Sequence, residues 1–467
     1  MWTHSEYDYE NRRVETNAVR FEESLLENFP VYFDAQTVLE LFDYFIEKGK
    51  TETAFRLIEY GADAHPNEPA MLCRRALALM ELDRHVEAFV CIERALDVIP
   101  EDEEVWVVRA QILDRTGNHE QALQTLQRGL AFLGHSPAIN FELGLIFQTR
   151  GMYEEALPHF RAALECGAVE EAYAELILCY EELEKAEECL QWLEARADQN
   201  PFDAAAWYHY GLALTKNERY EQAINAFQNA IAIEDDNFAH HYALALALVE
   251  MKRYSHAVPA LLDALLLCPD EKTILMFLGE CYEELAQPAL ARVYYMRCKK
   301  HHPSYPEAWY GIGSTFESEG KYLECVYYYE KALELDENFY DALLGLAACE
   351  YELGNEVSAM EALEKAIAYM PEDVLLWDEW AGRLEEDGRL ADAYAFVKRG
   401  LAYNPGSPEL IYRLAALAFK LNRVAESLAA FESALLVFFD GHEQFFEMCP
   451  EAADKPVYRA MVARYRD

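Results

Sequence analysis

Residues 306–339 read PEAWYGIGSTFESEGKYLECVYYYEKALELDENF, and this stretch decides the fold. Small and large apolar residues lie at helical spacing on both sides of Gly320, which predicts two antiparallel helices joined by a turn. The same arrangement returns every 34 residues through most of the chain. Prolines mark this period, because three pairs are each 34 residues apart: Pro66 and Pro100, Pro269 and Pro303, and Pro371 and Pro405.

With these prolines at position 32 of a repeat, the frame predicts twelve consecutive repeats. They begin at residues 35, 69, 103, 137, 170, 204, 238, 272, 306, 340, 374 and 408, and only the fourth is shorter, with 33 residues. Position 20 tests the frame independently, because it is small in every repeat: Ala54, Ala88, Ala122, Ala156, Cys189, Ala223, Ala257, Ala291, Cys325, Ala359, Ala393 and Ser427. If small residues filled about a quarter of sites by chance, such a column would arise on the order of once in ten million trials.

Other positions of the frame fit the packing of paired helices. Two helices approach to about 8–10 Å only where the side chains at their crossing are small, so small columns at positions 8, 20 and 27 predict helix crossings. Large residues fill positions 4 and 24, as in Trp309 and Tyr329, and glycines at position 15 predict the turns. Prolines at position 1 predict first helical residues, and Ser136-Pro137 and Ser407-Pro408 predict an N-cap followed by proline.

These columns resemble the tetratricopeptide repeat, W-x2-L-G-x2-Y followed by Ala, Phe, Ala and Pro at fixed offsets. The clearest copy carries Trp309, Ile312, Gly313, Phe316, Gly320, Tyr322, Cys325, Tyr329 and Ala332. The resemblance covers residues 35–441 and implies an all-α, right-handed superhelical solenoid of about twelve repeats. It also implies a non-enzymatic scaffold that binds protein or peptide partners. Ile177 and Arg196 occupy normally small slots of the fifth repeat, so we hypothesise a hinge near residues 168–203.

The two ends lie outside the predicted array. Residues 1–34 are predicted to form a flexible N-terminus, polar over residues 1–20, and a capping helix at Phe21–Phe29. Residues 442–467 are predicted to form a C-terminal capping helix that covers the last repeat with Val457, Met461, Val462 and Tyr465.

Composition excludes several classes of function. The chain has 467 residues, with 40 Lys+Arg against 84 Asp+Glu, a net charge of -44. This excess of acidic residues argues against a protein that binds nucleic-acid phosphates and against one that docks on an anionic membrane. The 52% of hydrophobic residues predict a folded protein rather than a disordered one. No secretory signal or membrane-spanning stretch is visible, and the eleven cysteines form no Cys-x-x-Cys pair. We therefore expect reduced cysteines and a cytoplasmic location.

No catalytic or metal-binding motif stands out in the sequence. Gly311-Ile312-Gly313 resembles the start of a dinucleotide loop but lacks a third glycine and a preceding strand, so we interpret both glycines as packing residues. His240 and His241 are adjacent on a helix and point about 100° apart, which disfavours a shared metal. Cysteines at positions 10, 20 and 27 are interpreted as small hydrophobic residues. We therefore expect no enzyme activity, no cofactor and no metal.

By resemblance, the first helix of each repeat lines a concave face, and positions 2, 5, 9 and 12 are the candidate contact rows. Aromatic residues at position 5 and carboxylates at positions 9, 12 and 13 predict an acidic groove between about residues 137 and 420, suited to a basic or Arg-bearing protein or peptide. The candidate residues are Phe141, Glu181, Tyr208, Tyr242, Met276, Glu280, Glu283, Glu284, Tyr310 and Glu317.

Alternatives stay open at this point. The aromatic residues of position 5 could pack between neighbouring first helices, with the carboxylates as ordinary solvated surface. The ends of the array could stack with further copies of the chain, which would make it a structural protein. An enzyme or metabolite-binding protein without a familiar motif is the third possibility.

Overall fold

The computed structural model describes residues 4–27, 29, 31–65, 68–167 and 170–465, and every regular element in these ranges is a helix. The chain divides into two units, Met1–Met251 and Lys252–Asp467. The division falls within the seventh predicted repeat, between its two helices. The hinge hypothesised near residues 168–203 stays a prediction, and Pro66, one of the prolines that mark the period, lies outside the described residues.

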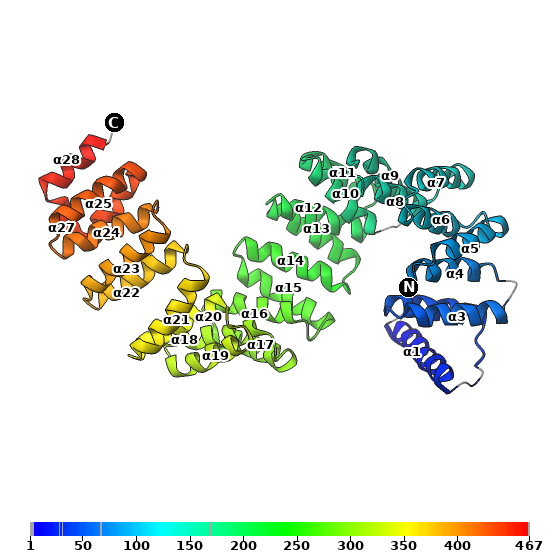
Figure 1. Ribbon diagram of the computed structural model, residues 1–467, viewed down its shortest axis with the longest axis horizontal. Helices are drawn as coiled ribbons and strands as arrows, with labels where there is room; N and C mark the ends of the chain where they lie inside the picture. Colours follow the sequence, from blue (N-terminus) through cyan, green and yellow to red (C-terminus); the bar gives the residue numbers. More distant parts are fainter. Residues whose placement is uncertain (1–3, 28, 30, 66–67, 168–169, 466–467) are drawn as a thin grey trace. The chain divides into compact units, whose positions relative to one another are not determined.

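In the first unit consecutive helices pack against each other in order, as Figure 1 shows. They are α1 (His4–Glu27), α2 (Ala35–Glu47), α3 (Thr51–Ala64), α4 (Ala70–Glu81), α5 (His85–Val98), α6 (Glu103–Arg115), α7 (His119–Leu133), α8 (Pro137–Gln148), α9 (Tyr153–Cys166), α10 (Glu171–Glu182), α11 (Ala186–Gln199), α12 (Ala204–Lys216), α13 (Tyr220–Ile233) and α14 (Phe238–Glu250).

The second unit continues the same pattern and ends in short helices. They are α15 (Tyr254–Leu267), α16 (Lys272–Glu284), α17 (Pro288–His301), α18 (Pro306–Glu317), α19 (Tyr322–Leu335), α20 (Tyr340–Glu352), α21 (Glu356–Tyr369), α22 (Val374–Glu386), α23 (Leu390–Tyr403), α24 (Pro408–Lys420), α25 (Val424–Val437), η1 (Phe439–Gly441), α26 (His442–Met448), α27 (Pro450–Ala453) and α28 (Pro456–Tyr465). The prediction of an all-α fold of paired helices is confirmed.

The helix ends follow the 34-residue frame closely. Each first helix begins at the predicted repeat start or one residue later, and each second helix begins 16 residues after that start. Ser136 and Ser407 accept hydrogen bonds from the backbone N–H of Ile139 and Leu410, which confirms both as N-caps with proline at the first helical position. Pro69 differs by one residue, because it stands at the N-cap of α4 rather than inside it.

The turn between the two helices of a repeat has the same backbone conformation throughout. Position 15 has a positive φ in all twelve repeats: Gly49, Asp83, Gly117, Gly151, Glu184, Glu218, Lys252, Ala286, Gly320, Gly354, Gly388 and Asn422. Six of these residues are not glycine, so the left-handed turn is set by the helix pair and not only by the residue type.

The columns of small and large residues pack as complementary surfaces. A Cβ atom added at Gly144, Gly211, Gly279 or Gly313, all at position 8, would lie within 2.1–2.5 Å of the position-24 ring of the same repeat. All twelve residues of position 20 are buried. Gly311 and Gly313 face Tyr295 and Tyr329 respectively, which supports their interpretation as packing residues.

Where position 4 is tryptophan, its side chain bonds to the proline of position 32 just before the repeat. The indole N–H of Trp106, Trp309 and Trp377 donates to the carbonyl oxygen six residues earlier, at Pro100, Pro303 and Pro371, over 2.8–2.9 Å. His241 stands at position 4 of its repeat and its Nε2 lies 2.9 Å from the carbonyl oxygen of Asp235. His240 bonds a different carbonyl, that of Glu234, so the two adjacent histidines have separate backbone partners.

The two ends differ from the prediction in their helix bounds. We expected residues 1–20 to be polar and flexible, but α1 already begins at His4, and Val14, Ala18 and Phe21 of this helix form an apolar stripe that packs against α2. At the other end three short helices replace one capping helix. Val457 is exposed there, whereas Met461, Val462 and Tyr465 are partly buried against the core of the last repeat, as predicted. Tyr458 is fully buried against the rings of Phe431 and Phe445.

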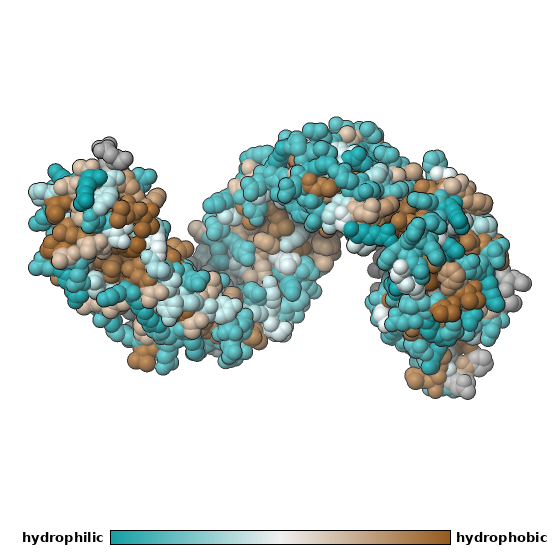
Figure 2. Space-filling view, turned by 45° about the horizontal axis from the view of Figure 1, so that its top comes forward, coloured by the Kyte–Doolittle hydropathy of each residue, from teal (hydrophilic) through white to brown (hydrophobic). Residues whose placement is uncertain are grey.

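On the face in Figure 2 hydrophilic residues cover most of the surface and hydrophobic residues form separate patches. Among the described residues, no helix has the length and apolar character that crossing a bilayer requires.

Candidate functional site

The candidate residues fall into two sets, one in each unit, which are described separately. Phe141, Glu181, Tyr208 and Tyr242 belong to the first unit, on α8, α10, α12 and α14. Met276, Glu280, Glu283, Glu284, Tyr310 and Glu317 belong to the second, on α16 and α18. First helices of neighbouring repeats contact each other in both units, as α12 does with α14 and α16 with α18. Residues on their outer face are therefore neighbours across repeats.

Tyrosine side chains orient two carboxylates on α16 and α18. The hydroxyl of Tyr295 donates to Glu283 Oε2 over 2.6 Å, and Ser314 Oγ donates to Glu283 Oε1 over 2.8 Å. One repeat later Tyr329 donates to Glu317 Oε2, also over 2.6 Å. Both bonds join position 24 to position 12 of one repeat, so the repeat itself fixes where these carboxylates lie.

Burial and like charge perturb this acidic group. The pKa of Glu280 is raised, first by desolvation and then by the nearby Glu283 carboxylate. The pKa of Glu283 is raised by desolvation, although its bonds from Tyr295 and Ser314 oppose the shift. Desolvation and the surrounding carboxylates of Glu317 and Glu283 also raise the pKa of Tyr310. Glu280 and Glu283 therefore carry negative charge where negative charge is costly, whereas the raised pKa keeps the hydroxyl of Tyr310 neutral at neutral pH.

Lysine and arginine neutralise equivalent carboxylates elsewhere on the first helices. Glu181 accepts from Lys216 over 2.6 Å, one repeat later. Glu385 contacts Arg413 over 3.3 Å and also Lys420. Throughout the described ranges, by contrast, no lysine or arginine forms an ion pair with the carboxylates of α16 and α18: Glu280, Glu283, Glu284 and Glu317. This group, which we call the α16–α18 acidic cluster, retains its uncompensated charge.

The aromatic residues of position 5 are only partly available. Phe141 lies 5.8 Å from Phe160, Tyr208 lies 6.0 Å from Phe227 and Tyr310 lies 5.3 Å from Tyr329, ring centroid to ring centroid. Each partner is the position-24 ring of the same repeat. The three position-5 rings and Tyr242 are half-buried, and Met276 is buried in the core. The position-5 rings therefore pack largely within their own repeats and are only partly exposed.

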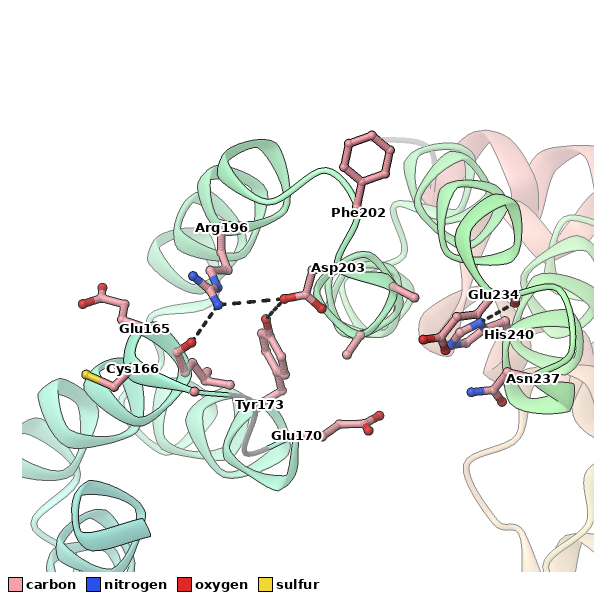
Figure 3. A pocket seen from close by; sticks show the side chains of 14 residues that line it. Glu165, Cys166, Glu170, Tyr173, Arg196, Phe202, Asp203, Glu234, Asn237 and His240 are labelled. Carbon is pink, nitrogen blue, oxygen red and sulfur yellow. Dashed lines mark hydrogen bonds and ion pairs between the residues drawn. The ribbon is translucent and has the colours of Figure 1, made fainter. Parts of the chain in front are cut away.

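A pocket of about 470 Å³ lies in the first unit at the irregular fifth repeat. It is lined by the end of α9, by Tyr173 of α10, by Arg196 of α11 and by residues around the starts of α12 and α14. Figure 3 shows Arg196 reaching across it. Its guanidinium donates to the carbonyl oxygen of Leu164 over 2.7 Å and lies 3.9 Å from Asp203 Oδ2, which Tyr173 also contacts over 3.4 Å.

Four carboxylates line this pocket against one arginine: Glu165, Glu170, Asp203 and Glu234. The ring of Tyr173 stacks on His209 with centroids 4.9 Å apart, and burial raises the pKa of Tyr173 to about 12. Burial lowers the pKa of His209 to about 4, so its 3.9 Å approach to Glu170 is not an ion pair at neutral pH. Phe202 is 88% exposed at the pocket edge.

The sequence did not predict this pocket, although it marked the irregular repeat in which the pocket lies. Ile177 and Arg196 at normally small positions and the 33-residue fourth repeat were the departures from the frame near this point. In the structure α10 packs more extensively against α9 than against α11, its own repeat partner. The pocket lies beside Arg196, at the pair of helices with this weaker packing.

One group of side chains in the described residues has the composition of a metal site. Glu317, Cys325 and Cys349 place one ligand atom each within 4.8 Å of the others, and both cysteines are fully buried. Glu317 thus belongs both to the acidic cluster and to this group. The sequence frame assigned the cysteines to packing positions, which their burial fits, but it did not place them side by side.

Five family models of the tetratricopeptide repeat match the chain, at residues 211–252, 242–298, 306–339, 341–372 and 384–445. This chain is a tetratricopeptide-repeat protein. Proteins of this family are generally scaffolds for protein interaction, and the fold is typically non-enzymatic. No curated protein matches the sequence.

Solved tetratricopeptide-repeat structures resemble the chain at low sequence identity. Yeast Tom70 is 13% identical, over 92% of this chain and 96% of that one, with a TM-score of 0.42. A repeat protein from Parabacteroides merdae is 18% identical over 56% of this chain and 99% of its own, with a TM-score of 0.41. The Cut9–Hcn1 structure is 14% identical over 92% and 96%, with a TM-score of 0.35.

Proposed function

We propose that this tetratricopeptide-repeat protein is a non-enzymatic scaffold that binds a basic or Arg-bearing segment of a protein or peptide partner on the α16–α18 acidic cluster. The observation that supports this most directly is the contrast between paired and unpaired carboxylates. Glu181 and Glu385 are held by cations of neighbouring repeats, whereas Glu280, Glu283, Glu284 and Glu317 have no such partner within the described part of the chain. A cationic partner would supply the positive charge that these carboxylates lack.

The geometry of the cluster favours a guanidinium group over a mobile ammonium. Glu283 and Glu317 are fixed by Tyr295 and Tyr329, so their free lone pairs have set directions that a planar, multiply donating group can match. Charge-assisted hydrogen bonds of this kind are stronger in a partly desolvated site than in water. The half-buried ring edge of Tyr310 adds an apolar contact for the arginine stem.

Desolvation also makes the cluster responsive to a bound cation. Because burial and mutual repulsion raise the pKa values of Glu280 and Glu283, a bound positive charge would relieve the repulsion and favour their ionised forms. Binding is therefore expected to weaken on acidification at a higher pH than for ordinary surface carboxylates. The large net negative charge of -44 would in addition speed encounter with a basic partner.

The test is the affinity of an arginine-rich peptide, compared with a peptide of the same length whose arginines are replaced by glutamine. We expect the arginine-rich peptide to bind and its affinity to fall with ionic strength, because salt screens exposed charges. The triple variant Glu280→Gln, Glu283→Gln, Glu284→Gln should bind at least roughly tenfold more weakly, since charge-assisted hydrogen bonds contribute about 1.5–3 kcal/mol each. Glutamine at position 283 keeps one oxygen that can accept from Tyr295 or Ser314, and its amide N–H can donate to the hydroxyl of the other residue, which preserves the local packing.

A matched control removes the same charge from another surface. Glu324→Gln, Glu330→Gln and Glu361→Gln change three exposed carboxylates on the second helices α19 and α21. This variant should retain the affinity of the native protein. Equal losses in both triple variants, or binding that does not depend on salt, would contradict a site on the first helices.

A further inference from the structure

Two cysteines of adjacent repeats meet inside the second unit. Cys325 lies at position 20 on α19, and Cys349 lies at position 10 of the next repeat, on α20. Their sulfur atoms are 2.7 Å apart, and both residues are fully buried. A disulfide bond is about 2.05 Å long, so a closing movement of about 0.7 Å brings the two sulfurs to bonding distance.

The repeat frame makes this pair distinctive. Position 20 of one repeat and position 10 of the next recur along the array, and cysteine occupies one of the two positions in several places. Cys281, for example, stands at position 10 with Ala257 at position 20 of the preceding repeat. Only at Cys325 and Cys349 do consecutive repeats of this sequence carry cysteine in both positions.

We propose that Cys325 and Cys349 form a site for a disulfide that links the ninth and tenth repeats when a peroxide is supplied. This inference does not depend on the proposed binding function. The bond would fix α19 to α20, next to Glu317 of the acidic cluster.

The chemistry balances with hydrogen peroxide as the oxidant. One thiol loses its proton and the sulfur attacks a peroxide oxygen, which breaks the O–O bond and leaves a sulfenic acid and, after protonation of the released hydroxide, water. The second sulfur displaces the sulfenic oxygen, which leaves as water, and the S–S bond forms. Together the two thiols lose two protons and two electrons, and the peroxide is reduced to two waters.

Surrounding groups set the rate of the first step. The contact with Cys325, burial and the negative charge of Glu317 raise the pKa of Cys349, while the nearby Arg383 opposes this shift. Tyr310 and Tyr329 also face Cys325. The reactive thiolate is therefore scarce at neutral pH, and oxidation is slow. Removing the charge of Glu317 should increase the thiolate fraction and hence the rate.

The experiment treats the full chain with hydrogen peroxide, alkylates the remaining thiols after denaturation, and maps tryptic peptides by mass spectrometry. Cleavage at lysine places Cys325 in peptide 322–331 and Cys349 in peptide 332–365. We expect these two peptides to appear as one disulfide-linked species, lighter by two hydrogen atoms than their sum, while Cys281 remains alkylated. Dithiothreitol should separate them again.

Two variants test the assignment. Cys325→Ala should abolish the linked species without unfolding the chain, because nine of the twelve repeats carry alanine at this position. Glu317→Gln should increase the rate of disulfide formation several-fold, and glutamine can still accept the hydrogen bond from Tyr329.

Three outcomes would overturn the proposal. Both cysteines could remain fully alkylated after peroxide treatment, or become oxidised to sulfinic acids without a linked species. Alternatively, native mass spectrometry of the purified chain could show one bound zinc ion that is lost in both Cys325→Ala and Glu317→Gln. The last result would assign the three side chains to a metal site, since Glu317→Gln weakens a metal site but accelerates disulfide formation.

Discussion

A single glycine on α16 shows how tightly the small and large columns fit. A Cβ atom at Gly279 would lie 2.1 Å from Cε1 of Tyr295, whose ring is fully buried and whose hydroxyl is held by Glu283. Gly279→Ala should therefore lower the free energy of unfolding by about 1–3 kcal/mol, the usual cost of overpacking. In an unobstructed helix the same change would stabilise the protein by about 1 kcal/mol.

Gly382 on α22 provides the comparison, because the nearest atom to its added Cβ, Arg413 Nη1, is 3.9 Å away. Gly382→Ala should raise stability, and urea denaturation of both variants measures the difference. If Gly279→Ala were also stabilising, the ring of Tyr295 would have room to move, and the orientation of Glu283 would not be fixed.

Some properties of individual residues were readable from the sequence and others were not. The columns at positions 8, 20 and 24 were predictable because helix crossings impose the same size limit in every repeat. The ion pairs of Glu181 with Lys216 and of Glu385 with Arg413 were not, because they depend on how far long side chains reach between repeats. For this reason the sequence could predict an acidic face but could not tell its paired carboxylates from its unpaired ones.

At the scale of elements, the turn between paired helices offers a direct measurement of backbone strain. Ala286 joins α16 to α17 with a φ of 56°, a conformation that costs a non-glycine residue about 1–2 kcal/mol. Ala286→Gly should relieve this cost, partly offset by the greater freedom of glycine in the unfolded chain, for a net gain of roughly 0.5–1 kcal/mol.

The same position one repeat later supplies the reverse substitution. Gly320 has a φ of 70°, and an added Cβ meets nothing within 4 Å, so Gly320→Ala changes only the backbone preference. It should lower the free energy of unfolding by about 1 kcal/mol. Opposite signs for the two variants in urea denaturation would establish that the turn is imposed by the packed helices. Equal signs would contradict this.

Element bounds inside the array followed from the 34-residue period, whereas those at the ends did not. A repeat has eleven other copies to define its frame, but α1 and the helices after α25 have none. The stripe of Val14, Ala18 and Phe21 packs α1 against α2, and Tyr458 anchors α28 through contacts with Phe431 that no repeat position specifies. The pocket beside Arg196 similarly lies at one irregular repeat.

At the scale of the whole molecule, a net charge of -44 makes stability depend on pH. Carboxylates repel one another in the folded state more than in the expanded unfolded chain, so partial protonation should stabilise the fold before acid unfolding begins. Groups with raised pKa values contribute to this effect, because their folded form binds a proton more tightly than their unfolded form.

Glu142 on α8 makes this expectation specific. It is 9% exposed, burial raises its pKa, and its carboxylate accepts a hydrogen bond from Gln111 over 3.0 Å. With a folded pKa above the unfolded value, its stabilising contribution is complete below the unfolded pKa and is lost as pH rises through the folded pKa. Melting temperature should therefore rise as pH falls from about 7.5 towards 5.5. Asp34 and Glu364 have lowered pKa values, so the stability they contribute is lost only at more acidic pH.

Glu142→Gln keeps the bond to Gln111 and removes the charge, so this variant should melt higher at neutral pH and show a shallower pH dependence. The exposed Glu324→Gln should follow the native curve. A native melting temperature that falls steadily over this range would show that lost hydrogen bonds, rather than relieved repulsion, dominate the response to acid.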